Sequence, residues 1–151
     1  GFENEYDNMD HSELSNAGKF GIHPFVINMG QGIIPKKLGF KLSAPTTGMN
    51  LRRVLRAMQI SKPILLEGSP GVGKTSLISA LARASGHTLV RINLSEQTDI
   101  SDLMGSDLPM PEESSDENGN VSSEGSFKWC DGALLKAIKN GHWVLLDELN
   151  L

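Results

Sequence analysis

The clearest chemistry in this sequence lies in one glycine-rich segment. The pattern G-x-x-x-x-G-K-[ST], whose backbone cradles nucleotide phosphates, is met in full by Gly68-Ser69-Pro70-Gly71-Val72-Gly73-Lys74-Thr75. Glycines let backbone N–H groups approach phosphate oxygens that a side chain would block. Lys74 is placed to reach the β- and γ-phosphates, and the Thr75 hydroxyl to ligate Mg²⁺. We therefore predict that Gly68 through Ser76 bind ATP, with Lys74 also acting in catalysis and Thr75 as a metal ligand.

A second candidate site consists of two adjacent carboxylates. Asp147 and Glu148 follow the apolar run Trp143-Val144-Leu145-Leu146. A carboxylate at the end of a buried strand is able to hold Mg²⁺, and its neighbour to orient and deprotonate a water molecule. Asp147 is therefore the predicted metal ligand and Glu148 the predicted catalytic base. Taken alone, each segment has a simpler interpretation, a glycine-rich turn into a helix and a solvated strand end. Together they predict ATP binding that depends on Mg²⁺, with hydrolysis by direct water attack.

Strands and helices alternate around these two segments. Apolar residues at helical spacing predict helices, and short apolar runs predict strands. Gly86 and Gly141 are expected to end two of the helices, Thr47 or Asn50 to cap the first, and Thr98 to cap a short one. Helices are predicted at 50–59, 74–85, 98–104 and 132–140, and strands at 64–67, 87–94, 127–129 and 143–147. This alternation predicts an α/β fold with a parallel sheet and flanking helices.

Charge divides the chain into three predicted regions. Residues 1–20 form an acidic leader that we expect to be disordered, since residues 1–13 contain five Asp or Glu and no Lys or Arg. Residues 21–60 form a basic segment with a helix that precedes the phosphate loop. Residues 61–151 form the nucleotide-binding part, interrupted by an acidic insert at 106–126 that we expect to be flexible. Because no aromatic residues interleave with the basic ones, we predict no direct nucleic-acid binding.

Two further classes of protein are disfavoured. No apolar run approaches the roughly 18 to 20 residues that a membrane-spanning helix needs, so no membrane partner is expected. The single cysteine, Cys130, excludes an internal disulfide and leaves too few thiolates for a cysteine-built zinc site. A reducing, intracellular compartment fits this cysteine content best.

Several longer segments resemble the modules of the dynein-related AAA+ ATPases that act in ribosome assembly. The resemblance covers about Phe40 to Leu151. It is carried by Glu67–Thr75 (EGSPGVGKT), Arg91–Gly105 (RINLSEQTDISDLMG) and Trp143–Leu151 (WVLLDELNL). Bacterial ATPases of the MoxR type share a looser version of these motifs. The fold class predicted by the resemblance is therefore a P-loop NTPase of the AAA+ type, truncated after the strand that ends in Asp147, the Walker B strand.

The resemblance also implies a cellular function. Proteins of this kind carry six AAA+ modules in one chain, which form a ring with ATP at the interfaces between neighbouring modules. The ring releases assembly factors from precursors of the large ribosomal subunit, the pre-60S particles, in the nucleolus and nucleoplasm. On this basis we expect ATP and Mg²⁺ as cofactors and neighbouring modules, pre-60S particles and assembly factors as partners. The alternatives are a remodelling ATPase of the MoxR type and a truncated module that binds nucleotide without hydrolysis.

One departure from the family pattern limits these expectations. In AAA+ modules of this type a further strand, a polar sensor residue, an arginine finger and a helical lid follow the Asp-Glu strand. The sequence stops at Leu151, four residues after Asp147. We therefore expect the isolated chain to be inactive as an ATPase. The residues do not indicate which module of the ring this would be.

Overall fold

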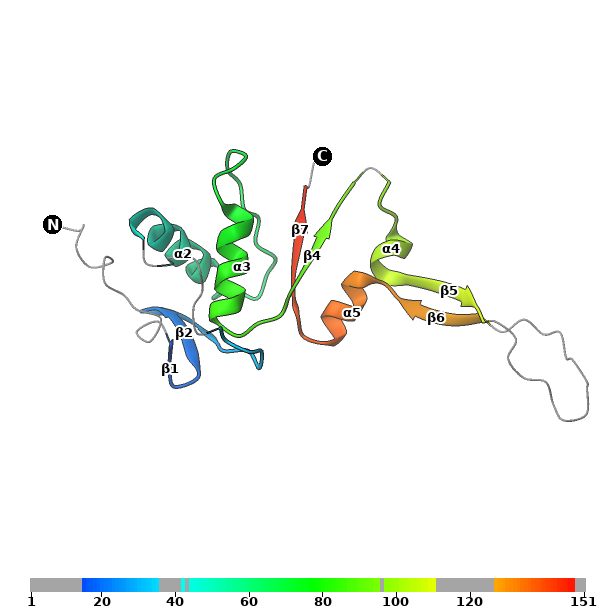
Figure 1. The fold of residues 1–151 in the computed structure, drawn as a ribbon, viewed down its shortest axis with the longest axis horizontal. Helices are drawn as coiled ribbons and strands as arrows, with labels where there is room; N and C mark the ends of the chain where they lie inside the picture. Colours follow the sequence, from blue (N-terminus) through cyan, green and yellow to red (C-terminus); the bar gives the residue numbers. More distant parts are fainter. Residues whose placement is uncertain (1–14, 36–41, 43, 96, 111–126, 149–151) are drawn as a thin grey trace, which may run out of the picture. The chain divides into compact units, whose positions relative to one another are not determined.

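The computed structural model describes residues 15–35, 42, 44–95, 97–110 and 127–148 (Figure 1). The chain divides into two compact units, Gly1–Leu89 (unit 1) and Val90–Leu151 (unit 2). No helix in the described ranges is long and apolar enough to cross a membrane.

Unit 1 begins with a small antiparallel sheet of three strands in the order β1 (Ser15–Asn16), β2 (Lys19–Ile22) and β3 (Phe25–Asn28). Ala17 and Gly18 join the first two strands with φ angles of 50° and 75°, as a two-residue turn with two left-handed residues requires. The sheet extends across residue 20, the predicted boundary between the acidic leader and the basic segment. The rest of the predicted disordered leader, residues 1–14, lies outside the described residues.

Helix α2 (Pro45–Ala57) starts five residues earlier than predicted. Its N-cap is Ala44, so neither Thr47 nor Asn50 caps it. Proline explains the earlier start, because its fixed φ suits the first helical turn and its missing N–H costs no hydrogen bond there. The predicted apolar face is confirmed, since Leu51, Val54 and Leu55 are buried.

Helix α3 (Lys74–Ala84) follows the phosphate loop, as predicted. It ends at Ser85, and Gly86 follows with a φ angle of 72°. The N–H of His87 donates to the carbonyl of Ala82 and that of Gly86 to the carbonyl of Arg83, a Schellman motif. The core of unit 1 gathers apolar side chains from β2, α2 and α3, including Phe20, Leu51, Leu55, Leu77 and Leu81.

The predicted strand at 64–67 is wrong. Leu65 is 71% exposed and Ile64 39% exposed, and within the described residues no backbone segment pairs with them. A buried strand needs hydrogen-bonded neighbours and covered faces. An apolar run indicates only that its residues tend to be buried. A strand also requires a neighbouring strand to pair with, which the local sequence does not specify.

Strand β4 (Leu89–Asn93), which belongs to unit 2 from Val90 onward, pairs with β7 (Trp143–Asp147), and the two run in the same direction in Figure 1. The N–H of Leu94 donates to the carbonyl of Asp147 at 3.0 Å. Both strands were predicted, β7 with these bounds. Their parallel pairing and the flanking helices confirm the α/β class.

Helix α4 (Ile100–Met104) is capped by Asp99 rather than by Thr98. The N–H of Asp99 donates to the carboxylate of Asp102 in a capping box. The Thr98 hydroxyl instead accepts a hydrogen bond from the N–H of Ser95. The carboxylate of Asp99, one residue after Thr98, is therefore the acceptor that caps the first turn of α4.

The first residues of the predicted acidic insert, 106–126, pair with the strand that follows the insert. Strand β5 (Gly105–Pro109) pairs antiparallel with β6 (Phe127–Asp131), so residues 106–109 belong to a ribbon, while 111–126 lie outside the described residues.

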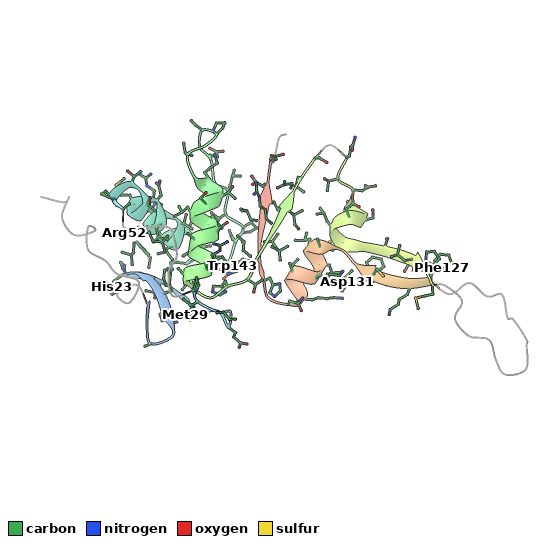
Figure 2. All side chains as sticks on the ribbon, viewed as in Figure 1. His23, Met29, Arg52, Phe127, Asp131 and Trp143 are labelled. Atoms are coloured by element: carbon green, nitrogen blue, oxygen red, sulfur yellow. The ribbon has the colours of Figure 1, made fainter. Side chains whose placement is uncertain are left out.

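Helix α5 (Ala133–Lys139) follows, close to its predicted bounds. Asp131, at the end of β6 and labelled in Figure 2, accepts hydrogen bonds from Lys139 Nζ at 2.6 Å and Trp129 Nε1 at 2.8 Å.

Candidate nucleotide-binding site

The phosphate loop lies in unit 1 and leads directly into α3. Gly71 and Gly73 have φ angles of 77° and 81°, in the left-handed region that glycine adopts without strain. A Cβ atom on either residue would meet nothing within 4 Å, so backbone conformation rather than crowding favours glycine there. Gly73 is the N-cap of α3, and its carbonyl accepts the N–H of Leu77. The loop thus has the backbone that the motif predicts.

The Lys74 side chain folds back over this loop. Its Nζ donates to the carbonyl oxygens of Gly68 at 2.5 Å and Ser69 at 3.0 Å. A Cβ on Gly68 would lie 3.3 Å from Val72 Cγ2, which is tight, and 3.8 Å from Lys74 Nζ, which is an ordinary contact, so a side chain there would crowd Val72 rather than the lysine. Lys74 and Thr75 are half-buried, whereas Gly68 through Val72 and Ser76 are exposed.

These residues fit a polyphosphate group. An ammonium that already satisfies two carbonyl oxygens is in position to exchange them for phosphate oxygens, to which its charge-assisted hydrogen bonds are stronger. The N–H groups in the first turn of α3, which point along the helix axis toward the loop, add to the same anion site. Thr75 and Asp147 offer the oxygen ligands that Mg²⁺ prefers.

Asp147 is held by two groups of unit 2. Its Oδ2 lies 2.5 Å from the guanidinium of Arg91, on the neighbouring strand β4, and its Oδ1 accepts the N–H of Glu148 at 3.0 Å. The Asp147 side chain is 25% exposed and that of Arg91 53%. The predicted metal ligand is therefore oriented by a positive side chain that belongs to neither of the two predicted motifs.

Glu148 leaves β7 in an unusual conformation. Its φ angle is 57°, which is uncommon for a residue with a side chain and costs of order 1–3 kcal/mol. Such strained residues cluster at functional sites. The strain therefore falls on the residue that the sequence predicts to be the catalytic base.

The structure groups the predicted residues into two sets. Gly68 through Ser76 lie together in unit 1, and Asp147 and Glu148 lie together in unit 2. The meeting of the two sets around Mg²⁺ stays a prediction from the motifs. In the sequence, Arg91 is only a basic residue within a predicted strand. Basic residues are common in strands, so this position alone does not identify Arg91 as a functional residue.

Residues 63–151 match the family of AAA domains described as the dynein-related subfamily. The chain therefore belongs to the dynein-related AAA domains. Membership in this family of ATPases implies nucleotide binding, usually with Mg²⁺.

Two relatives identify the type of module more closely. Midasin of Dictyostelium discoideum is 58% identical over 138 residues, and midasin of Giardia intestinalis 56% identical over 116 residues. These matches cover 91% and 77% of this chain but 2% of each midasin, so the chain spans about one fiftieth of these curated relatives. An uncharacterized protein of Staphylococcus saprophyticus is 36% identical over 94 residues, which are 62% of this chain and 33% of that protein. The resemblance predicted from the sequence is thus confirmed as similarity to part of midasin.

Proposed function

We propose that this chain binds ATP with Mg²⁺ and hydrolyses it as one AAA+ module of a midasin-like ATPase. The observation that carries the proposal is the Lys74 ammonium folded over a loop whose glycines adopt left-handed conformations. Gly68 through Ser76 would surround the phosphates. Thr75 and Asp147 would hold the metal, and Glu148 would orient and deprotonate the attacking water.

Each group has a distinct task in this proposal. Lys74 neutralises charge on the β- and γ-phosphates, and the N–H groups at the start of α3 fix the phosphate oxygens. Bound Mg²⁺ supplies further charge stabilisation during phosphoryl transfer. The Asp147 carboxylate is already oriented by Arg91 and by the Glu148 N–H, which reduces the entropy lost when it binds the metal.

The cellular setting is a further part of the proposal. Similarity to midasin over most of the chain supports a module within a ring of AAA+ modules. The resemblance of the motifs implies that such a ring releases assembly factors from pre-60S particles in the nucleus. An antibody against residues 107–124 tests this setting in cell extract. We expect it to detect a protein of several hundred kilodaltons that sediments with nuclear pre-ribosomes, and a band of 16.3 kDa would contradict it.

A second candidate function is nucleotide binding without hydrolysis. The ion pair between Arg91 and Asp147 favours it, because a metal ligand that is already neutralised is less available to Mg²⁺. The substitution Glu148→Gln in the full-length protein separates the two candidates. For a hydrolysing module, labelling of the phosphate loop by a photoreactive ATP analogue persists, while turnover at this module falls by about 10²- to 10⁴-fold. Unchanged turnover together with persistent labelling would favour the second candidate.

A further inference from the structure

A basic groove lies on α2 and β3 of unit 1. It has a volume of about 330 Å³ and is lined by Phe25, Met49, Arg52, Arg53 and Arg56. The Arg52 guanidinium lies over the ring of Phe25, with Cζ 5.8 Å from the ring centroid (Figure 2 labels Arg52). All three arginines are exposed, and Met49 is 51% exposed. The groove thus combines an apolar floor with a strongly positive rim.

The wall of the groove is fixed in place by a side chain outside it. Gln59, just beyond the end of α2, donates from Nε2 to the carbonyl of Val26 on β3 at 3.1 Å and to that of Leu55 on α2 at 2.9 Å. This amide ties the helix to the strand that carries Phe25. The groove is therefore a feature of the packed unit and needs no ligand to form.

Carboxylates are distributed very unevenly in unit 1. The sequence contains no Asp or Glu between Leu14 and Leu66, and α3 contains none either. Apart from Glu67, every carboxylate side chain of Gly1–Leu89 lies in residues 1–13. This acidic segment carries five Asp or Glu together with three large side chains of apolar character, namely Phe2, Tyr6 and Met9. Its charge and its apolar side chains both complement the groove.

The strand register places the start of β1 near the groove. Ser15 pairs with Phe20 and Asn16 with Lys19, so Ser15 lies on the side of the sheet where Ile22 pairs with Phe25, a residue of the groove. Strands β1 and β3 flank β2, which separates them by roughly 10 Å. An extended chain advances about 3.3–3.6 Å per residue, so the segment is long enough to cross this distance and follow α2 past all three arginines.

We propose that residues 1–13 bind in the groove between α2 and β3, with carboxylates on Arg53 and Arg56 and an aromatic side chain against Met49 and Phe25. This intramolecular contact is independent of nucleotide binding. It assigns a role to the acidic segment and to the basic face of α2, neither of which the phosphate loop uses.

Photocrosslinking of the full 151-residue chain tests the proposal. Tyr6 is replaced by p-benzoylphenylalanine, which inserts readily into methionine C–H bonds, and the labelled peptides are identified by mass spectrometry. We expect intramolecular labelling of Met49. The yield should fall several-fold between about 0.1 M and 1 M salt, because the Debye length shortens from about 10 Å to about 3 Å.

Matched charge reversals provide the control. Arg56 and Arg83 each lie in the last turn of a helix of unit 1 and are exposed, but only Arg56 lines the groove. Arg56→Glu should remove most of the labelling of Met49, whereas Arg83→Glu and Arg56→Lys should keep it. Circular dichroism verifies that each variant is folded, and Arg53→Glu replaces Arg56→Glu if the latter unfolds.

Three outcomes overturn the proposal. The first is labelling of Met49 that survives both Arg56→Glu and Arg53→Glu. The second is labelling only between two chains, increasing with protein concentration, which would assign the groove to a second copy. The third is no labelling of Met49 together with binding of a single-stranded RNA that Arg56→Glu abolishes, which would assign the groove to nucleic acid.

Discussion

The guanidinium of Arg91 lies 2.5 Å from the carboxylate of Asp147, across the parallel pair of β4 and β7. Asp147 is also the residue that the sequence predicts as a ligand of Mg²⁺. A divalent cation that binds there must share this carboxylate with Arg91 or displace it. The ion pair therefore keeps Asp147 oriented and at the same time competes with the metal.

Replacing Arg91 by methionine should tighten Mg²⁺ binding. Two unit charges 4 Å apart interact by about 1 kcal/mol even in water, so removal of the guanidinium should strengthen binding by about fivefold or more. Calorimetric titration of Mg²⁺ into protein saturated with a non-hydrolysable ATP analogue measures this. Stability should change by less than about 1 kcal/mol, because the Arg91 side chain is 53% exposed.

Lys139→Met is the matched control for this change. Lys139 forms the comparable ion pair with Asp131 at 2.6 Å, with side chains 58% and 20% exposed, and it lies in the same unit. This substitution should leave Mg²⁺ binding unchanged. Weaker binding of Mg²⁺ in Arg91→Met would contradict the competition and would make the arginine a support for the metal site.

Asp131 should respond to acid in a defined way. Hydrogen bonds from Lys139 and, second, from Trp129 hold the pKa of its carboxyl below the ordinary value of 3.8. A lowered pKa in the folded protein stabilises the fold above pH 3.8, and this contribution is lost as the pH falls through the lowered value. Carboxyl ¹³C NMR titration should show a larger rise of the Asp131 pKa in Lys139→Met than in Trp129→Phe. The reverse order would contradict the assignment of causes.

Two glycines that end helices should differ in their tolerance of alanine. Gly86 and Gly141 have φ angles of 72° and 67°, so alanine at either position costs about 1–2 kcal/mol of conformational strain. A Cβ on Gly86 would also lie 3.1 Å from the carbonyl oxygen of Gly30 and 3.2 Å from that of Gly32, whereas one on Gly141 meets nothing within 4 Å. Amide hydrogen exchange should therefore show greater loss of protection in α3 for Gly86→Ala than in α5 for Gly141→Ala. Equal losses of protection in the two variants would mean that the close contacts around Gly86 add no destabilisation beyond the backbone strain.

Local patterns predicted the helices better than the strands. Gly86 and Gly141 ended their helices as predicted, because the left-handed residue after a helix is a local requirement. The strand predicted at 64–67 and the missed sheet at 15–28 both depend on pairing. Strands of two to four residues carry too little alternation to be recognised, and the turn at Ala17-Gly18 lacks the asparagine or aspartate that marks many such hairpins.

The part of the candidate site that could be predicted from sequence is the part formed by one continuous motif. Gly68 through Thr75 specify the loop and the start of α3 by themselves, which is why Lys74 was found from sequence. The contact between Arg91 and Asp147 depends on the register of two strands separated by more than fifty residues in sequence, which local patterns do not encode.

Nucleotide binding by the 151-residue chain and its Lys74→Ala variant tests the central claim most directly. Fluorescence anisotropy of a labelled ATP analogue with Mg²⁺ measures the affinity, and Lys62→Ala serves as the control, because Lys62 is an exposed lysine ahead of the loop. Loss of charge-assisted hydrogen bonds worth about 1.5–3 kcal/mol should weaken binding by roughly 10- to 100-fold in Lys74→Ala, and Lys62→Ala should bind like the parent chain. Equal affinity in Lys74→Ala and the parent chain would contradict the assignment of this loop as the phosphate site.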